Sequence, residues 1–253
     1  MPAHISWVNS GVLYRIFQVL KRDFRQALGF TWKWFMRPRP LLLIGIAALV
    51  AVGVVWVLPW DDKAPLVLRP TDQEARESVK QVAQALSFYG DFAGFNLVLF
   101  LGLLSTGWLL RSRKFMRLAV ASLLCACLSG LCANVIRSAT GRPRPSTKAE
   151  DRLHGPSFSS AYQALPSAHT ATAFGGALPV LLSAPVTGTP LALLAAGVGW
   201  SRLQLNRHHL TDVLASVLLS FLFSLPLTRW AMLGRMRSAS SLTHASDTYR
   251  PSR

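Results

Sequence analysis

Residues 118–145 read LAVASLLCACLSGLCANVIRSATGRPRP, an apolar run that ends in a basic turn rich in proline. No charged residue interrupts the run before Arg137. A helix needs about 17–25 mostly apolar residues to cross a bilayer, and this stretch reaches that length. The segment is therefore expected to span a membrane, with its charged turn at one surface.

The rest of the chain holds five more apolar segments, at about 41–57, 95–110, 170–186, 191–205 and 210–227. Of the 253 residues, 51% are hydrophobic and only 15% are charged, whereas a soluble domain carries about 25% charged residues. Two segments, 95–110 and 191–205, are slightly short, but a half-span would leave backbone polar groups unsatisfied in lipid. The sequence therefore predicts an all-α, polytopic membrane protein with about six transmembrane helices.

The chain is expected to divide into three parts. Residues 1–39 form a basic cytoplasmic or interfacial segment, residues 40–230 form the transmembrane domain, and residues 231–253 form a disordered cytoplasmic tail rich in Ser, Thr and Arg. Within the first part, residues 12–35 suit a helix on a membrane surface or an ordinary soluble amphipathic helix. Residues 73–88 are a second candidate for an amphipathic helix.

The formal net charge of +16 indicates an anionic partner. In a soluble protein this charge would suggest nucleic acid. Here the basic residues flank apolar segments, where they act as topology signals and contact anionic lipid, so we expect a lipid bilayer and no nucleic acid as partner. By the positive-inside rule, both termini and the loop 111–117 are cytoplasmic, and the loops 60–94, 137–169 and 201–209 lie outside.

Several basic residues lie in these outer loops against that rule, and they are candidates for a shared anion site: Arg137, Arg142, Arg144, Lys148, Arg152, Arg202 and Arg207. Guanidinium groups match phosphate oxygens, so Arg137, Arg144 and Arg202 could surround one phosphoryl group. The alternative is contact with lipid headgroups. The acidic residues of the loop 60–94 are expected to be solvated: Asp61, Asp62, Asp72, Glu74 and Glu77. No carboxylate cluster resembles a metal site, so we expect neither metal nor cofactor.

Two histidines and an aspartate could supply nucleophilic catalysis. His208 and Asp212 are spaced to share one helical face, so the carboxylate could hold the ring in one tautomer. His209 is a rival for that carboxylate. His169 lies on another segment and could protonate a leaving group. Ser167 precedes it where a helix begins, and a helix N-terminus binds anions.

The stretches 137–145, 166–169 and 201–212 together resemble the type 2 phosphatidic acid phosphatase superfamily. This family has the pattern Lys-x6-Arg-Pro, then Pro-Ser-Gly-His, then Ser-Arg-x5-His-x3-Asp. It includes lipid phosphate phosphatases, undecaprenyl-diphosphate phosphatases, lipid A phosphatases and vanadium haloperoxidases. The resemblance covers roughly residues 95–227 and implies a helical bundle of this kind.

The resemblance also implies a role for each matching residue. Arg144 and Arg202 would bind phosphate with Ser167 and the backbone of Ala168. His208 would be the nucleophile that forms a phosphohistidine, Asp212 would orient it, and His169 would act as general acid and then as base. Arg137 replaces the family lysine and keeps its charge. Ala168 replaces the family glycine, which is costly only where the backbone needs a positive φ.

These inferences predict a metal-independent phosphatase in a bacterial inner membrane, with its site on the extracytoplasmic face. The substrate class stays open among polyprenyl diphosphate, phosphatidylglycerol phosphate, phosphatidic acid and lipid A. A lipid phosphotransferase using the same site is one alternative, and a non-catalytic lipid-binding membrane protein is another. A binding protein has no need of the set His169, His208 and Asp212, which argues against the last.

Overall fold

The chain folds into a bundle of helices in the computed structural model, which describes residues 10–57, 61, 70–90, 92–147, 149 and 152–247. These residues form eight α-helices and no strand, which confirms the predicted all-α class. The helices are α1 (Ser10–Phe35), α2 (Pro38–Val57), α4 (Gln73–Tyr89), α5 (Leu97–Leu109), α6 (Arg113–Thr140), α7 (Ala168–Ser183), α8 (Pro185–Gln204) and α9 (Leu210–Asp247). A π-helical turn, Phe92–Asn96, leads into α5.

Each of the six predicted apolar segments is a helix, namely α2 and α5 to α9. Three stretches are long and apolar enough to cross a membrane: Phe92–Leu109, Arg113–Thr147 and Leu210–Leu233. Helix α2 adds a shorter apolar stretch, Leu42–Ala51. Gly, Thr and Ser recur along α7 and α8. The chain is therefore a membrane protein whose inner helices depend on neighbouring helices more than on lipid.

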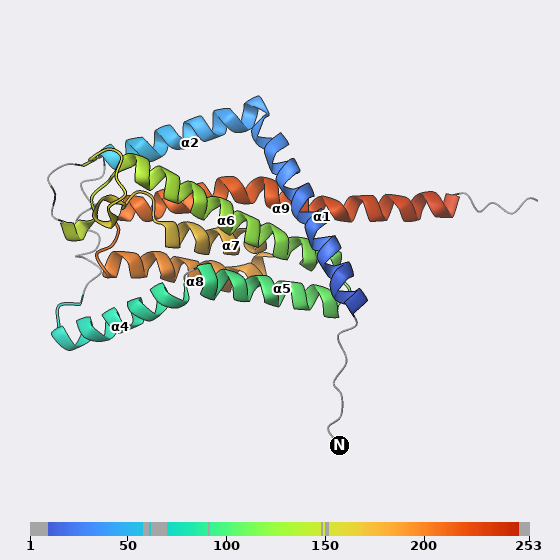
Figure 1. Cartoon of the computed structure of the whole chain (residues 1–253), viewed down its shortest axis with the longest axis horizontal. Helices are drawn as coiled ribbons and strands as arrows, with labels where there is room; N and C mark the ends of the chain where they lie inside the picture. Colours follow the sequence, from blue (N-terminus) through green and yellow to red (C-terminus); the bar gives the residue numbers. More distant parts are fainter. Residues whose placement is uncertain are drawn as a thin grey trace, which may run out of the picture.

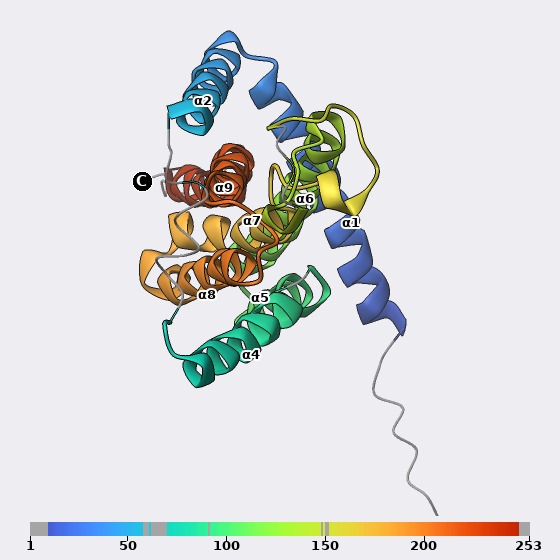
Figure 2. The ribbon, with the colours of Figure 1, turned by 90° about the vertical axis from the view of Figure 1, so that its left-hand side faces the viewer.

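Helix α7 lies at the centre of the bundle and packs against α6, α8 and α9 (Figures 1 and 2). Small residues allow this close approach. A Cβ atom on Gly175 would lie 2.7 Å from the Cα atom of Ala126 on α6, and one on Gly188 would lie 2.2 Å from the Cα atom of Leu181. Ser220 on α9 donates a hydrogen bond of 2.8 Å to the carbonyl oxygen of Ala171. Small residues and hydroxyl bonds are the usual means of helix association in membranes.

The peripheral helices extend beyond this core. Helix α1 crosses one end of the bundle and packs against α6 and α9 (Figure 1). It buries Asp23 and Ala27 but leaves Phe17 and Trp32 exposed, a pattern that favours the membrane-surface interpretation. Helix α4 matches the amphipathic helix predicted for residues 73–88.

Helix α9 is longer than the sequence suggested. It continues to Asp247, so residues 231–247 are helical where we expected a disordered tail. Extending an existing helix costs far less than nucleating one, and the Ala, Leu, Met and Arg residues in this stretch are good helix formers. The expected segments at residues 1–9 and 248–253 lie outside the described residues.

Candidate active site

A glycine at the end of α6 turns the chain back over the bundle. Gly141 has a φ of 58°, in the left-handed region, and a Cβ atom there would lie 1.7 Å from the carbonyl oxygen of Gly155. The backbone N–H of His154 donates to the carbonyl oxygen of Gly141 at 3.1 Å, and that of Gly155 donates to Thr140 at 3.2 Å. Only glycine fits this helix end, and the fold-back that it permits holds residues 154–157 against the end of α6.

Backbone hydrogen bonds bring the three motifs to one end of the bundle. The N–H of Ala164 donates to the carbonyl oxygen of Arg142 at 3.0 Å. The N–H of Ser167 donates to the carbonyl oxygen of Asp212 at 3.3 Å, which joins the start of α7 to the start of α9. The same end holds the C-terminal ends of α6 and α8, at the left of Figure 1 and facing the viewer in Figure 2.

His208 lies between α8 and α9 with only 1% of its surface exposed. Its Nδ1 atom is 2.7 Å from the carbonyl oxygen of Ala164. A carbonyl oxygen can only accept, so Nδ1 carries the proton and Nε2 keeps its lone pair. Burial lowers the pKa of His208, and the carboxylate of Asp212 opposes this shift. The ring is therefore neutral at pH 7 and has one nitrogen available for attack.

Asp212 is completely buried in the first turn of α9. Its Oδ2 atom accepts a hydrogen bond of 2.8 Å from the backbone N–H of His209 and lies 3.7 Å from Nδ1 of His208. The ring of His209 instead has its Nε2 atom 3.3 Å from the carbonyl oxygen of Pro143. This arrangement favours His208 over His209 as the residue that Asp212 assists.

Arg142 and Asp61 do not behave as the sequence suggested. The Nη1 atom of Arg142 donates to Asp212 at 2.5 Å and to Thr211 at 2.7 Å, and its Nη2 atom donates to Asp61. Asp61 also accepts a bond of 2.8 Å from the backbone N–H of Thr211. The prediction that Arg142 joins the anion site and that Asp61 is solvated is therefore wrong. Both are buried, and a buried charge must be paired.

The other acidic residues of this loop are solvated where the structure describes them. Asp72 caps α4 by accepting a hydrogen bond of 3.0 Å from Ala75, and Glu77 forms an exposed ion pair of 3.5 Å with Lys80. Asp62 and Lys148 lie outside the described residues.

Further arginines lie beside this network. Arg137 occupies the last turn of α6, and Arg144 lies close enough to Arg137 and Arg207 for their like charges to repel. The Nε atoms of Arg137 and Arg144 are buried and have no acceptor among the described residues. Arg202, near the end of α8, donates to Ser87 of α4 at 2.5 Å, and its charge acts on His208. Such a cluster of guanidinium groups suits a phosphate.

The start of α7 faces the same region. Ser167 is the N-cap residue and accepts hydrogen bonds from the N–H of Thr170 at 3.5 Å and from its hydroxyl at 3.0 Å. Ala168 is the first helical residue and has no positive φ. Alanine therefore fits here without strain in place of the family glycine. His169 follows in the same first turn and is half-buried.

Two participants could not be found from the sequence motifs. Ala164 contributes its backbone carbonyl, which every residue type has, so the sequence cannot identify it. Asp61 is 81 residues from Arg142 and 150 from Thr211, so only the tertiary fold joins them. One buried aspartate gives no local signal on a loop whose other described acidic residues are solvated.

Comparison with known proteins finds a family that resembles this part of the chain. Residues 118–235 match the family model described as the PAP2 superfamily, and this range contains all three motifs. Over this range the chain is similar to the PAP2 superfamily. The structure is similar to the crystal structure of the first transmembrane PAP2-type phosphatidylglycerolphosphate phosphatase from Bacillus subtilis, with a TM-score of 0.52 and 17% identity. That match covers 77% of this chain and 96% of the other. The comparison with curated proteins found no match.

The match to the PAP2 superfamily model, together with the likeness in fold to a transmembrane PAP2-type protein, supports a lipid phosphatase. At 17% identity, the likeness to the Bacillus subtilis protein concerns the fold and does not select a substrate.

The Asp61–Arg142–Asp212 network predicts the effect of one conservative change. Asp61→Asn removes one of two negative charges that face Arg142, while leaving an oxygen to accept from Thr211. We expect a fall in thermal stability. Losing one partner of a buried ion pair outright costs about 3–5 kcal/mol, and the cost here should be smaller because Arg142 keeps the second carboxylate, that of Asp212. We also expect a fall of about tenfold in kcat through misplacement of Asp212. Both are measurable by thermal unfolding and by phosphate release.

Glu77→Gln is the matched control. It removes a carboxylate from α4, the helix that follows the loop carrying Asp61, and the side chain of Glu77 is 64% exposed. It should leave both quantities unchanged. An Asp61→Asn protein as stable and as active as the wild type would show that the network does not support the site.

Proposed function

We propose that the protein is a metal-independent membrane lipid phosphatase that works through a phosphohistidine at His208. The observation that carries the proposal is the hydrogen bond of 2.7 Å from Nδ1 of His208 to the carbonyl oxygen of Ala164. It fixes the tautomer whose Nε2 atom is a nucleophile. Neighbouring arginines and the start of α7 offer the positive potential that a phosphoryl group needs.

In the first step, the guanidinium groups of Arg137, Arg144 and Arg202 hold the phosphoryl oxygens, with the hydroxyl of Ser167 and the N–H of Ala168. Nε2 of His208 attacks phosphorus, so a P–N bond forms as the P–O bond to the lipid breaks. His169 donates a proton to the leaving oxygen.

The ring of His208 gains positive charge in this step. The carboxylate of Asp212, 3.7 Å from Nδ1, stabilises that charge, and Arg142 holds the carboxylate in place. The buried ion pairs of Arg142 therefore serve the reaction indirectly, through the position of Asp212.

In the second step, water completes the hydrolysis. His169 is now unprotonated and takes a proton from water as the oxygen attacks phosphorus. The P–N bond breaks, inorganic phosphate leaves, and Nε2 of His208 recovers its lone pair. Arginine, not a metal ion, neutralises the phosphoryl charge in this scheme, so hydrolysis should persist in the presence of a chelator.

We further propose that the site faces the outer side of a bacterial inner membrane and that both termini are cytoplasmic. The basic loop 111–117 lies at the end of the bundle opposite the site, which supports this orientation. The substrate class is a lipid phosphate or diphosphate, of the polyprenyl diphosphate, phosphatidylglycerol phosphate, phosphatidic acid or lipid A type.

Replacement of the nucleophile tests the proposal. His208→Ala should lower phosphate release from each of these four lipid classes by at least about a thousandfold, because no other group can form the covalent intermediate. The assay contains a chelator and no second lipid acceptor. His209→Ala is the matched control, since the Nε2 atom of its ring lies 3.3 Å from the carbonyl oxygen of Pro143, and it should keep most of the activity.

Activity of His208→Ala equal to that of the wild type would refute the mechanism. A wild-type protein that releases phosphate only when a second lipid or a sugar is supplied would be a phosphotransferase instead. One that releases none under either condition would be a binding protein.

The lowered pKa of His208 predicts the acid limb of the pH profile. Attack requires the neutral ring of His208. Burial lowers the pKa of His208 below the ordinary value of 6.5, so its ring stays neutral at a lower pH than that of an ordinary histidine. We therefore expect kcat/KM to fall with a midpoint below pH 6.5. An acid limb with its midpoint above 6.5 would contradict the buried, neutral histidine.

A further inference from the structure

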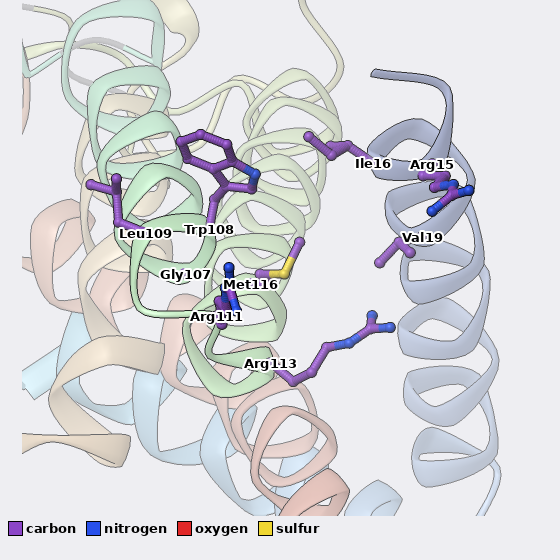
Figure 3. A pocket seen from close by; sticks show the side chains of 9 residues that line it. All are labelled: Arg15, Ile16, Val19, Gly107, Trp108, Leu109, Arg111, Arg113 and Met116. Carbon is purple, nitrogen blue, oxygen red and sulfur yellow. The ribbon is translucent and has the colours of Figure 1, made fainter. Parts of the chain in front are cut away.

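A pocket lies at the opposite end of the bundle from His208, between α1 and the turn that joins α5 to α6 (Figure 3). Its volume is about 510 Å³. Helix α6 begins beside this pocket at Arg113 and ends beside the candidate active site at Thr140. The two sites are therefore separated by the full length of α6 and share no residue.

The turn that forms one wall of the pocket is tightly built. A Cβ atom on Gly107 would lie 2.8 Å from Cγ and 2.9 Å from the backbone nitrogen of Met116, so the last turn of α5 rests directly on the first turn of α6. The N–H of Ser112 donates to the carbonyl oxygen of Gly107 at 2.8 Å. Arg111 has a φ of 49°, in the left-handed region that non-glycine residues rarely adopt. Such conformations cluster at ligand sites.

Three arginines line the pocket: Arg15 from α1, and Arg111 and Arg113 from the turn and the start of α6. Figure 3 shows Arg113 extending toward α1. No acidic residue is part of the lining, and none of the three guanidinium groups forms an ion pair within the described part of the chain. The pocket therefore concentrates positive charge that an anion would neutralise.

Other arginines at this end of the bundle are engaged with aromatic rings. The guanidinium group of Arg117 lies 5.6 Å from the ring centre of Trp230, and that of Arg229 lies 5.6 Å from that of Trp34. Arg15, Arg111 and Arg113 differ from these two arginines because they line the pocket.

The remaining wall of the pocket is apolar and lies at a membrane boundary. Ile16 and Val19 point from α1 toward the turn (Figure 3), and Trp108 is 58% exposed. The membrane-spanning stretch Phe92–Leu109 ends at this turn, and the stretch Arg113–Thr147 begins there. The turn therefore lies at the level of lipid headgroups. Tryptophan is enriched at that level. A ligand here needs an anionic group beside an apolar body.

We propose that this pocket binds an anionic phospholipid of the leaflet opposite the active site. The three arginines take the phosphate of the headgroup, and the acyl chains run along α5 beside Trp108. A bound lipid would join α1 to the rest of the bundle. This proposal does not depend on the reaction assigned to His208.

Lipid retention measured by native mass spectrometry tests the proposal. The purified protein is equilibrated with mixed micelles of phosphatidylglycerol and phosphatidylcholine. The wild type should retain phosphatidylglycerol in preference, and the triple variant Arg15→Gln/Arg111→Gln/Arg113→Gln should bind it at least about tenfold more weakly. Ile16→Trp keeps every charge but fills the pocket, and it should also weaken retention.

The control variant Lys21→Gln/Arg25→Gln/Lys33→Gln removes three exposed basic residues of α1 that do not line the pocket, and it should retain the lipid normally. His208→Ala should also retain it, because the lipid lies away from the active site. Equal loss in the control variant, or equal retention of phosphatidylcholine by the wild type, would overturn the proposal. Complete displacement by millimolar inorganic phosphate would assign the pocket to free phosphate and overturn it as well.

Discussion

The buried carboxylate of Asp212 is the interaction on which the candidate site depends. It is fully inaccessible to solvent, and a buried charge is tolerated only where partners compensate for lost hydration. Arg142 from the loop after α6 supplies a positive partner at 2.5 Å, and the backbone N–H of His209 supplies a hydrogen bond of 2.8 Å. Satisfying this one group requires segments far apart in sequence to meet, and their meeting places His208 beside a cluster of arginines.

The bundle makes that meeting possible. Helix α7 is narrow along much of its length because Gly and Ala dominate its buried faces, so α6, α8 and α9 can surround it closely. Its N-terminus then lies among the ends of these helices, where the backbone N–H of Ser167 donates a hydrogen bond to the carbonyl oxygen of Asp212. Packing by small residues and catalytic geometry are thus two results of the same sequence pattern.

Local patterns in the sequence predicted most of the helices. Apolar runs predicted the six core helices. The spacing of His208 and Asp212 predicted that their side chains lie close together, at 3.7 Å, although His208 precedes α9 and only Asp212 is on the helix. The two arginines in the turn 141–145 show the limit. Arg142 and Arg144 have the same chemistry and adjacent prolines, and only the tertiary fold pairs one with Asp61 and Asp212 and leaves the other beside Arg137. The carbonyl oxygen of Ala164 has no sequence signature at all.

The central claim is that Nε2 of His208 becomes bonded to phosphorus during turnover. Rapid acid-free quenching of the enzyme with a lipid phosphate carrying ³²P, followed by proteolysis and mass spectrometry, tests it most directly. The account predicts an acid-labile, base-stable phosphohistidine at residue 208 that forms and decays within a turnover. Label on His169 or His209 instead, or phosphate release with no phosphorylated protein at any time, would contradict it.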